Sequence, residues 1–476
     1  MGRGGRAMSE LAQAASHKAF WRLVPFLMLC YFFAYLDRLN MSFAALSMNT
    51  ALGYNAEIFG FGSGIFFIGY FIFEVPSNLI LEKVGARIWI ARIMITWGII
   101  SLCMIFQDAS WNSLLVPIAA PIAAAFRGIL WLIGTPSHFV ELTPNSAMLI
   151  VIRFLLGLAE AGFFPGIILF LTYWFTAKDR AKMVGMFMAA IPLSSVIGAP
   201  VSSQILAHVD GLMGLAGWKW LFILEAVPTV ILGFVAFGYL TDRPEKATWL
   251  TAPEREVLSQ TLANEKIERE AMRHYSLGEA LSNPRVLALS AIYFGNVTCN
   301  YGLGFFMPQI LQRFGIPIAD VGWYVAIPYL LAMISMVVWS RHSDETGERV
   351  WHVAGPLILA GLSFIGAGYA GSLALALIAF SLAAIGIYAS VCTFWALPTG
   401  FLTGAAAAGG IALINSLGNL GGFVGPSIVG HVKQVTGTDS AALLALAAFP
   451  ILAGFLTLII GHDKQMEMAG HPLSAR

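Results

Sequence analysis

The long apolar runs of this chain constrain its fold more than any other feature. A membrane-spanning helix needs roughly 20 mostly apolar residues. The 476 residues are 58% hydrophobic and only 11% charged, too few charges to cover the surface of a soluble protein. We therefore expect an all-α membrane protein with about twelve transmembrane helices. The runs that qualify are 21–46, 57–80, 88–106, 147–172, 182–206, 219–240, 286–311, 319–340, 351–370, 373–397, 405–430 and 441–461.

The distribution of lysine and arginine predicts the orientation of these spans. With both termini in the cytoplasm, the cytoplasmic segments carry 21 Lys and Arg residues and the outer loops carry 4. Positive charge is concentrated on the cytoplasmic side of membrane proteins. We therefore expect a multi-pass protein of the cell inner (plasma) membrane whose two termini are both cytoplasmic. The first apolar run is too long for a signal peptide and is interpreted as an uncleaved span.

Segment 107–146 does not fit a regular pattern of spans. Residues 114–134 are largely apolar but include Pro117, Pro121 and Arg127. A span here would make the number of helices odd and would reverse the charge rule for every later loop. We expect an outer insertion that lies at the membrane interface, and the alternative is a span or a re-entrant pair.

A short repeat divides the chain into two homologous halves. The loop after the second span and the loop after the eighth both read acid-x-x-Gly-x-Arg-aliphatic-Trp, beginning at Glu82 and at Asp344. Parallel repeats of this kind occur in two-bundle transporters. We expect a first bundle over 1–240, a cytoplasmic loop over 241–285 and a second bundle with a short tail over 286–476. The acids and arginines of the repeat are predicted gating residues, namely Glu82, Arg87, Asp344 and Arg349.

Four charges lie within predicted spans and are the main functional candidates. Asp37 and Arg38 are adjacent in the first span, and Arg153 and Glu160 share one face of the fourth. A charge in the bilayer is costly, so each is a functional hypothesis. An arginine can bind an anionic substrate, and a carboxylate can exchange a proton when its partner arginine is diverted. The alternative is two structural ion pairs.

Other polar residues in the spans give weaker signals. For Glu74 and Glu225 we favour a role in structural pairing or at a helix end. Several polar and aromatic side chains could line a cavity or could join helices to one another. These are Tyr70, Asn300, Tyr301, Trp395, Asn415 and Asn419.

Several functional classes are not supported by the sequence. The net charge of +1 argues against nucleic-acid binding. The four cysteines lie in apolar stretches at no metal-like spacing. No nucleophile–base constellation and no phosphate-binding glycine loop is present. We expect no catalytic residues, no metal site, no cofactor and no enzymatic activity.

Several motifs together resemble the anion:cation symporter family of the major facilitator superfamily. They extend over nearly the whole chain, except for the insertion at 107–146. The motifs are Leu36-Asp37-Arg38-Leu39-Asn40, Pro76-Ser77-Asn78 with Val84-Gly85-Ala86-Arg87, the run Arg153 to Gly166, Trp218 to Glu225, Leu240 to Pro244 and the glycine-rich 411–426.

This resemblance implies two six-helix bundles of the major facilitator fold and proton-coupled uptake of a small organic anion by a monomer. It implies that Asp37 and Glu160 are the protonatable pair, that Arg38 is the partner of Glu160, and that Arg153 binds the substrate carboxylate. Arg38 and the residues Tyr35, Tyr70, Trp395 and Asn415 are implied to line the substrate site.

Two departures from the family pattern concern the substrate. Cys392 and Phe394 beside Trp395, and the stretch 191–193, make the predicted pocket less polar than a galactonate-type site. We therefore expect a tartrate-like carboxylate or related sugar acid, with an aromatic carboxylate as the alternative. A facilitator or exchanger without proton coupling is the other alternative. The expected partners are thus the anion, protons and the lipid bilayer.

Overall fold

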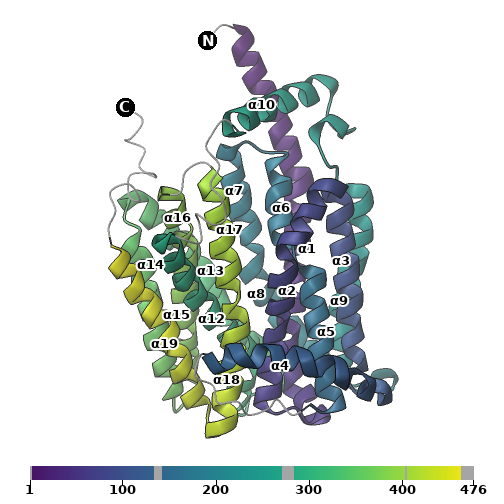
Figure 1. Cartoon of the computed structure of the whole chain (residues 1–476), viewed down its shortest axis with the longest axis vertical. Coiled ribbons are helices and arrows are strands. Elements are labelled where there is room, and N and C mark those ends of the chain that lie inside the picture. Colours follow the sequence, from purple (N-terminus) through teal and green to yellow (C-terminus); the bar gives the residue numbers. More distant parts are fainter. Residues whose placement is uncertain (1–2, 133–141, 271–282, 402–404, 462–476) are drawn as a thin grey trace.

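The computed structural model describes residues 3–132, 142–270, 283–401 and 405–461. Within these residues every regular element is a helix, and most helices run along one axis (Figure 1). Eleven helical segments of the described chain are long and apolar enough to cross a membrane. A further long helix, α12 (Pro284–Gln312), occupies the predicted seventh run and carries polar side chains such as Asn296 and Asn300. The predicted all-α membrane fold is confirmed.

The helices follow the predicted runs with three differences. The predicted fourth, fifth and eleventh spans are each built from two consecutive helices. The first half contains α1 (Arg3–Leu52), α2 (Ala56–Val84), α3 (Ala86–Leu102), α4 (Val116–Leu132), α5 (Pro144–Glu160), α6 (Phe163–Thr172), α7 (Ala177–Met188), α8 (Ala190–His208) and α9 (Gly217–Tyr239). After α10 (Ala252–Glu270), the second half contains α12, α13 (Ile318–Thr346), α14 (Val350–Gly368), α15 (Leu373–Phe394), α16 (Ala396–Phe401), α17 (Ala405–Asn419), α18 (Gly421–Thr436) and α19 (Asp439–Ile460). Short 3₁₀ helices are η1 (Cys103–Phe106), η2 (Ser110–Leu115), η3 (Leu212–Gly214) and η4 (Pro244–Lys246).

The break between α5 and α6 follows directly after Glu160. Gly162 has φ of +85°, and a Cβ atom there would lie 2.2 Å from Oγ of Ser77. Glycine is the residue that meets both requirements without strain. Five residues before this break, a Cβ at Gly157 would lie 1.9 Å from the backbone oxygen of Phe66. α2 and α5 therefore approach each other closely just where Glu160 enters the interior.

The two ends of the molecule are distinguished by the chain's own topology. α1 begins and α19 ends at the same end, which we call the terminal side (Figure 1). α10 lies on this side and is tied to α1 by Lys18 and Glu254, at 2.6 Å. α4 lies across the spans on the opposite side (Figure 1). An outer insertion over 107–146 stays a prediction, and its residues 133–141 lie outside the described residues, as do 271–282 of the middle loop and the tail from 462.

The predicted repeat loops both contain a glycine at positive φ, but with different ψ, 144° at Gly85 and −1° at Gly347. Gly85 joins α2 to α3 and Gly347 joins α13 to α14, with φ of +101° and +70°. In both loops a glycine at positive φ follows the end of a helix. α3 begins directly after Gly85, whereas Glu348 and Arg349 separate Gly347 from α14.

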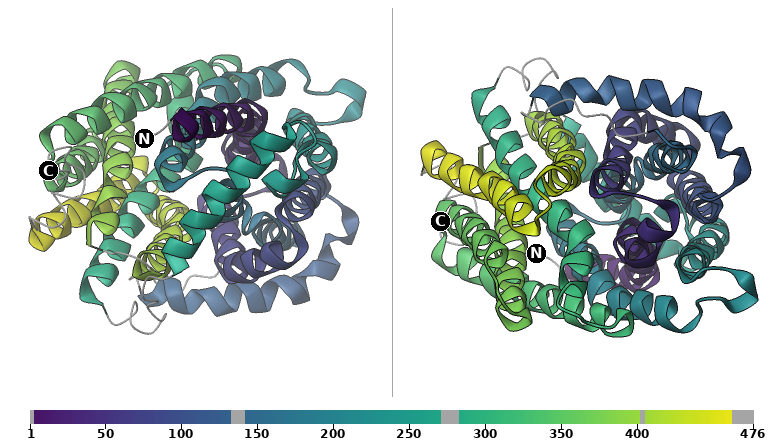
Figure 2. Two further views of the ribbon diagram at one scale, coloured as in Figure 1. Left: turned by 90° about the horizontal axis from the view of Figure 1, so that it is seen from above. Right: turned by 90° about the horizontal axis from the view of Figure 1, so that it is seen from below.

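The two halves form two groups of helices that lie side by side (Figure 2). Two glycine contacts bring these groups close together on the opposite side. A Cβ at Gly430 of α18 would lie 2.3 Å from the backbone oxygen of Ala56, at the start of α2. A Cβ at Gly322 of α13 would lie 2.0 Å from the backbone oxygen of Ala199 in α8. Such contacts need glycine because any side chain would separate the helices. The interface between the bundles is thus closed on the opposite side.

Candidate functional site

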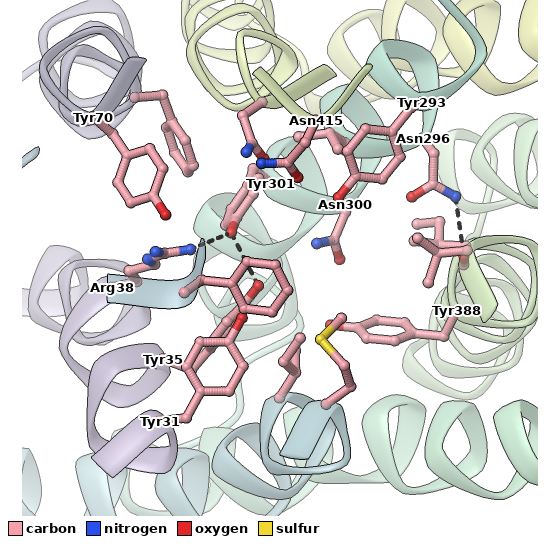
Figure 3. Close-up of a pocket in the computed structure, with 18 residues that line it drawn as sticks. Tyr31, Tyr35, Arg38, Tyr70, Tyr293, Asn296, Asn300, Tyr301, Tyr388 and Asn415 are labelled. Carbon is pink, nitrogen blue, oxygen red and sulfur yellow. Dashed lines mark hydrogen bonds between the residues drawn. The ribbon is translucent and has the colours of Figure 1, made fainter. Parts of the chain in front are cut away.

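A cavity of about 80 Å³ lies between the two bundles near the middle of the spans (Figure 3). Helices of both halves contribute to its wall. The first half contributes Tyr31, Tyr35, Arg38, Phe67, Tyr70, Phe164, Met188 and Ile191. The second half contributes Tyr293, Asn296, Val297, Asn300, Tyr301, Ile387, Tyr388, Val391, Asn415 and Asn419. Among these wall residues, Arg38 is the one that carries a positive charge.

Arg38 joins the two bundles at this cavity. Its Nε and Nη2 donate to Oε1 of Glu160 at 2.8 and 2.5 Å, and its Nη1 donates to the Tyr301 hydroxyl of α12 at 3.0 Å. The Tyr301 hydroxyl also lies 3.3 Å from the hydroxyl of Tyr35 (Figure 3). Arg38 is only 7% exposed. An anion that enters the cavity can reach this guanidinium only by competing with groups that already bind it.

Glu160 is the last residue of α5 and is 1% exposed. Among the described residues, Glu160 accepts hydrogen bonds from Arg38, and both are accepted by the same carboxylate oxygen, Oε1. A buried carboxylate that loses its cation is strongly destabilised in the charged form. Diverting Arg38 toward another anion would therefore favour protonation of Glu160.

Asp37 is buried but is held by neutral donors. Trp97 Nε1 and Thr229 Oγ1 donate to its Oδ2 at 2.8 and 2.9 Å. Asn40 and Ser101 lie 3.5 Å from its Oδ1. Among the described residues, no salt bridge includes Asp37. The two acids predicted to exchange protons therefore have different environments, because Glu160 is paired with a cation and Asp37 is not.

Arg153, the predicted ligand of the substrate carboxylate, does not line the cavity. It is 1% exposed, and its Nη2 donates to the backbone oxygen of Ser63 at 3.1 Å. Its guanidinium carbon lies 5.1 Å from the ring of Phe66 and 5.8 Å from the ring of Phe305, which belongs to the other bundle. Arg153 is thus enclosed where the bundles meet. In this arrangement of the bundles it cannot contact an anion in the cavity, so its role as the carboxylate ligand stays a prediction.

The remaining predicted binding residues are divided between the wall and the layer behind it. Tyr35, Tyr70 and Asn415 line the cavity. Trp395 does not, and its ring packs edge-on against Tyr293, with centroids 4.9 Å apart. Tyr293 itself lines the cavity, so Trp395 contacts a wall residue without being part of the wall.

Several wall residues were not predicted from the sequence. They are Tyr31, Tyr293, Asn296 and Tyr388, besides apolar neighbours. A helical spacing could have identified some of them, since Tyr293, Asn296 and Asn300 recur at positions i, i+3 and i+7 and so share one face of α12. The Asn296 amide donates to the backbone oxygen of Ile387 at 3.0 Å, which leaves its own oxygen for other partners.

Glu74 links the bundles on the terminal side of Arg38. Its carboxylate oxygens accept from Asn415 Nδ2 at 2.9 Å and from Ser416 Oγ at 3.1 Å. Because Asn415 also lines the cavity, Glu74 fixes the orientation of its amide. The Asn415 oxygen then remains available as an acceptor. Glu74 therefore pairs with Asn415 and Ser416 of the other bundle, in line with the structural pairing expected for it.

The predicted gating residues lie at the loops of the repeat. Arg349 binds Asp344 at 2.7 Å and the hydroxyl of Ser343 at 2.8 Å. Arg87 instead pairs with Asp242, whose Oδ1 also accepts from the Arg87 backbone N–H at 2.8 Å. Glu82 is exposed. The second motif thus forms an internal pair, while the arginine of the first motif contacts the segment that follows α9.

This arrangement can bind a small anion that also carries hydroxyl groups. One guanidinium supplies positive charge, and tyrosine hydroxyls and asparagine amides surround it. Phe67, Phe164, Met188 and Ile191 supply apolar wall. Such a combination of one charged group with a few polar groups in an otherwise apolar pocket is typical of ligand sites.

Comparison with known proteins places the chain among membrane transporters. A protein of Agrobacterium vitis named "Putative tartrate transporter" is 47% identical over 460 residues, which cover 97% of this chain and 94% of that protein. The "Putative metabolite transport protein NicT" of Pseudomonas putida is 38% identical over 450 residues, 94% of each chain. These relatives are named as transporters and not as enzymes.

The fold agrees with this comparison. The xylose transporter XylE of Escherichia coli, solved in a partially occluded inward-open conformation, superposes with a TM-score of 0.71 at 12% identity over 94% of this chain and 99% of that one. The family model described as Major Facilitator Superfamily matches residues 121–426. The chain is therefore a member of the Major Facilitator Superfamily, as the resemblance of its motifs implied, and a multi-pass transporter of the membrane.

Proposed function

We propose that this protein imports a small organic anion together with protons by alternating access. The observation that carries the proposal is the Arg38 guanidinium, which lies in a cavity between the bundles and is paired with the buried acid Glu160. A substrate carboxylate that binds Arg38 weakens this pair. Glu160 then takes up a proton, because a buried and unpaired carboxylate is costly.

The proton makes the loaded carrier easier to close. An anion alone would add negative charge to the interior, and each proton taken up with it offsets one of its charges. Asp37, which is buried without a cation, is the second proposed proton site. The bundles can then rearrange with less buried charge, and the substrate and the proton cross together.

The proposed substrate is a tartrate-like carboxylate or related sugar acid. Two relatives that are 47% identical to this chain are named for tartrate. The hydroxyl and amide groups of Tyr301, Asn300 and Asn415 at the cavity suit a hydroxy acid, because each can bind a substrate hydroxyl. The aromatic wall residues favour an aromatic carboxylate as the second candidate substrate. Arg153 is proposed to reach the substrate when the opposite side opens and Phe305 moves away from it.

Uptake into proteoliposomes tests this function. Radiolabelled L-tartrate should accumulate above its external concentration when the outside is acidic, and an uncoupler should abolish the accumulation. Unlabelled L-malate and benzoate, added as competitors, compare the hydroxy acid with the aromatic carboxylate. Tartrate uptake that is saturable but indifferent to the proton gradient would instead support an uncoupled facilitator or exchanger. The absence of any carboxylate uptake would refute the proposal.

A further inference from the structure

A second, smaller cavity lies on the opposite side of Tyr35 from the terminal side of the molecule. Its volume is about 20 Å³, enough for about one water molecule. α1, α8, α12 and α13 form its wall. The polar residues of the wall are Tyr35, Asn40, Ser42, Ser194, Ser195, Ser202 and Tyr329. Several of these hydroxyl groups already bind protein atoms, since Ser42 donates to the backbone oxygen of Leu39 and Ser194 to that of Ile191, so a water here depends on the polar atoms that have no such partner.

Several polar atoms around this cavity are buried without a hydrogen-bond partner among the described residues. They are Oδ1 of Asn40, Oγ of Ser195, Oγ of Ser203 and Oε2 of Glu225. A buried polar atom without a partner costs about 1–3 kcal/mol. A water molecule in the cavity would satisfy atoms of Asn40 and Ser195, which line it directly.

Glu225 of α9 is connected to this cavity and lacks a cation. It is 3% exposed, and Ser202 Oγ, which lines the cavity, donates to its Oε1 at 2.6 Å. No salt bridge of the described residues includes Glu225. The helices packed against α9 are chiefly α3, α1 and α8, and Asp37 of α1 is the charged group among them that acts on Glu225. An acid in these surroundings is far more stable with a proton bound.

The same cavity is also connected to Asp37. Asn40 lines it, and the Asn40 amide lies 3.5 Å from Oδ1 of Asp37, at the outer limit for a hydrogen bond. Glu225 and Asp37 are therefore each one side chain away from the same polar space.

We propose that Glu225 is a third proton-binding group, which passes protons arriving from the opposite side to Asp37 through water in this cavity. The inference rests on the proposed proton-coupled function. In the transfer, protonated Glu225 gives its proton to the Ser202 hydroxyl, the hydroxyl gives its own proton to the cavity water, and the water gives a proton to the Asp37 carboxylate when the Asn40 side chain turns aside. The products are a Glu225 carboxylate and protonated Asp37, with the water unchanged. A proton from the bulk water on the opposite side then restores Glu225.

The test uses the full chain in proteoliposomes with L-tartrate as the probe. Gradient-driven uptake is measured over a range of external pH, and tartrate counterflow is measured at equal pH on both sides. Glu225→Gln should lower the initial rate of gradient-driven uptake by about tenfold or more and flatten its dependence on external pH. Counterflow needs no net proton transfer and should stay within about twofold of wild type. Glu225→Asp, which keeps a carboxyl group, should restore part of the uptake.

Ser427→Ala is the matched control for Ser202→Ala. Ser427 of α18 is buried like Ser202, but it does not line this cavity, and its hydroxyl has no hydrogen-bond partner among the described residues, whereas that of Ser202 binds Glu225. Ser202→Ala should slow gradient-driven uptake and spare counterflow, whereas Ser427→Ala should resemble wild type. If Glu225→Gln does not fold, this serine pair decides the matter, and a wild-type profile for Ser202→Ala would overturn the proposal.

Two outcomes with Glu225→Gln would also overturn it. One is gradient-driven uptake with the rate and pH profile of wild type, and the other is an equal loss of uptake and counterflow, which a structural role would cause. A wild-type protein without any gradient dependence would refute the proposed function and this inference with it. A coupled wild type beside an unaffected Glu225→Gln would refute this inference alone.

Discussion

Neutralising Glu160 should strengthen substrate binding while it abolishes proton coupling. Arg38 donates two hydrogen bonds to Oε1 of Glu160, at 2.8 and 2.5 Å. Glutamine keeps an acceptor oxygen but removes the negative charge, so both bonds become bonds to a neutral group. A hydrogen bond to a charged group contributes about 1.5–3 kcal/mol and one to a neutral group about 0.5–1.5 kcal/mol. The substrate carboxylate in Glu160→Gln therefore competes against a partner that is weaker by about 2 kcal/mol.

This difference corresponds to an increase of about 30-fold in affinity. It should appear in alkaline buffer, where Glu160 of the wild type must gain a proton before it releases Arg38. The wild-type affinity for tartrate should thus fall as the pH rises, and the affinity of Glu160→Gln should change little. Isothermal titration calorimetry of L-tartrate binding to the purified proteins, in mildly acidic and mildly alkaline buffer, measures both effects. Uphill accumulation in proteoliposomes should be lost in the same variant.

Asp108→Asn is a suitable control for this change. Asp108 binds Lys219 at 2.6 Å at the surface of the same bundle, where ion pairs contribute little. The tartrate affinity and the uphill accumulation of the Asp108→Asn variant should match those of the wild type. Full gradient-driven accumulation by Glu160→Gln would refute the reasoning. So would a well-folded Glu160→Gln protein that binds tartrate no better than the wild type in alkaline buffer.

Three further changes test other parts of the account. Asp37→Asn keeps an oxygen for Trp97 and Thr229, so it should fold and support counterflow but not uphill accumulation; loss of both transport modes would show a structural role. Arg153→Lys removes a planar two-pronged donor and should weaken tartrate binding by about tenfold or more, measured by calorimetry, and an unchanged Kd in folded protein would contradict its role. Gly430→Ala places a Cβ 2.3 Å from the Ala56 oxygen and should increase the distance between α2 and α18, measured between spin labels. Gly238→Ala, where the added Cβ meets open space, is the control, and equal α2–α18 distances in both variants would contradict the closed interface.

The sequence predicted the elements that depend on one segment at a time. Apolar runs of the required length gave the helices, and a charge in such a run identified Asp37, Arg38, Arg153 and Glu160. The break after Glu160 was not predicted, because glycine is common in membrane helices, and the positive φ of Gly162 and its contact with Ser77 are visible only in the structure. Local composition therefore indicates which residues matter more readily than it indicates their geometry.

Contacts between the bundles could not be predicted from the sequence. Asn415 and Glu74 are separated by 341 residues, and Tyr301 and Arg38 by 263. Each pair depends on the register of two helices in different halves, which no local pattern encodes. Arg153 shows the same limit, since its sequence context marks it as functional while its enclosure by Phe305 depends on how the bundles meet. The polar stripe on α12 was within reach, because helical spacing alone places Tyr293, Asn296 and Asn300 on one face.

An anion that binds Arg38 should make the protein take up a proton. The most direct measurement adds L-tartrate to the purified protein in a weakly buffered detergent solution and records the change of pH. The wild type should take up about one proton or more per tartrate bound, and Glu160→Gln should take up fewer. Tartrate binding by the wild type without any proton uptake, across the range from mildly acidic to mildly alkaline, would contradict this expectation.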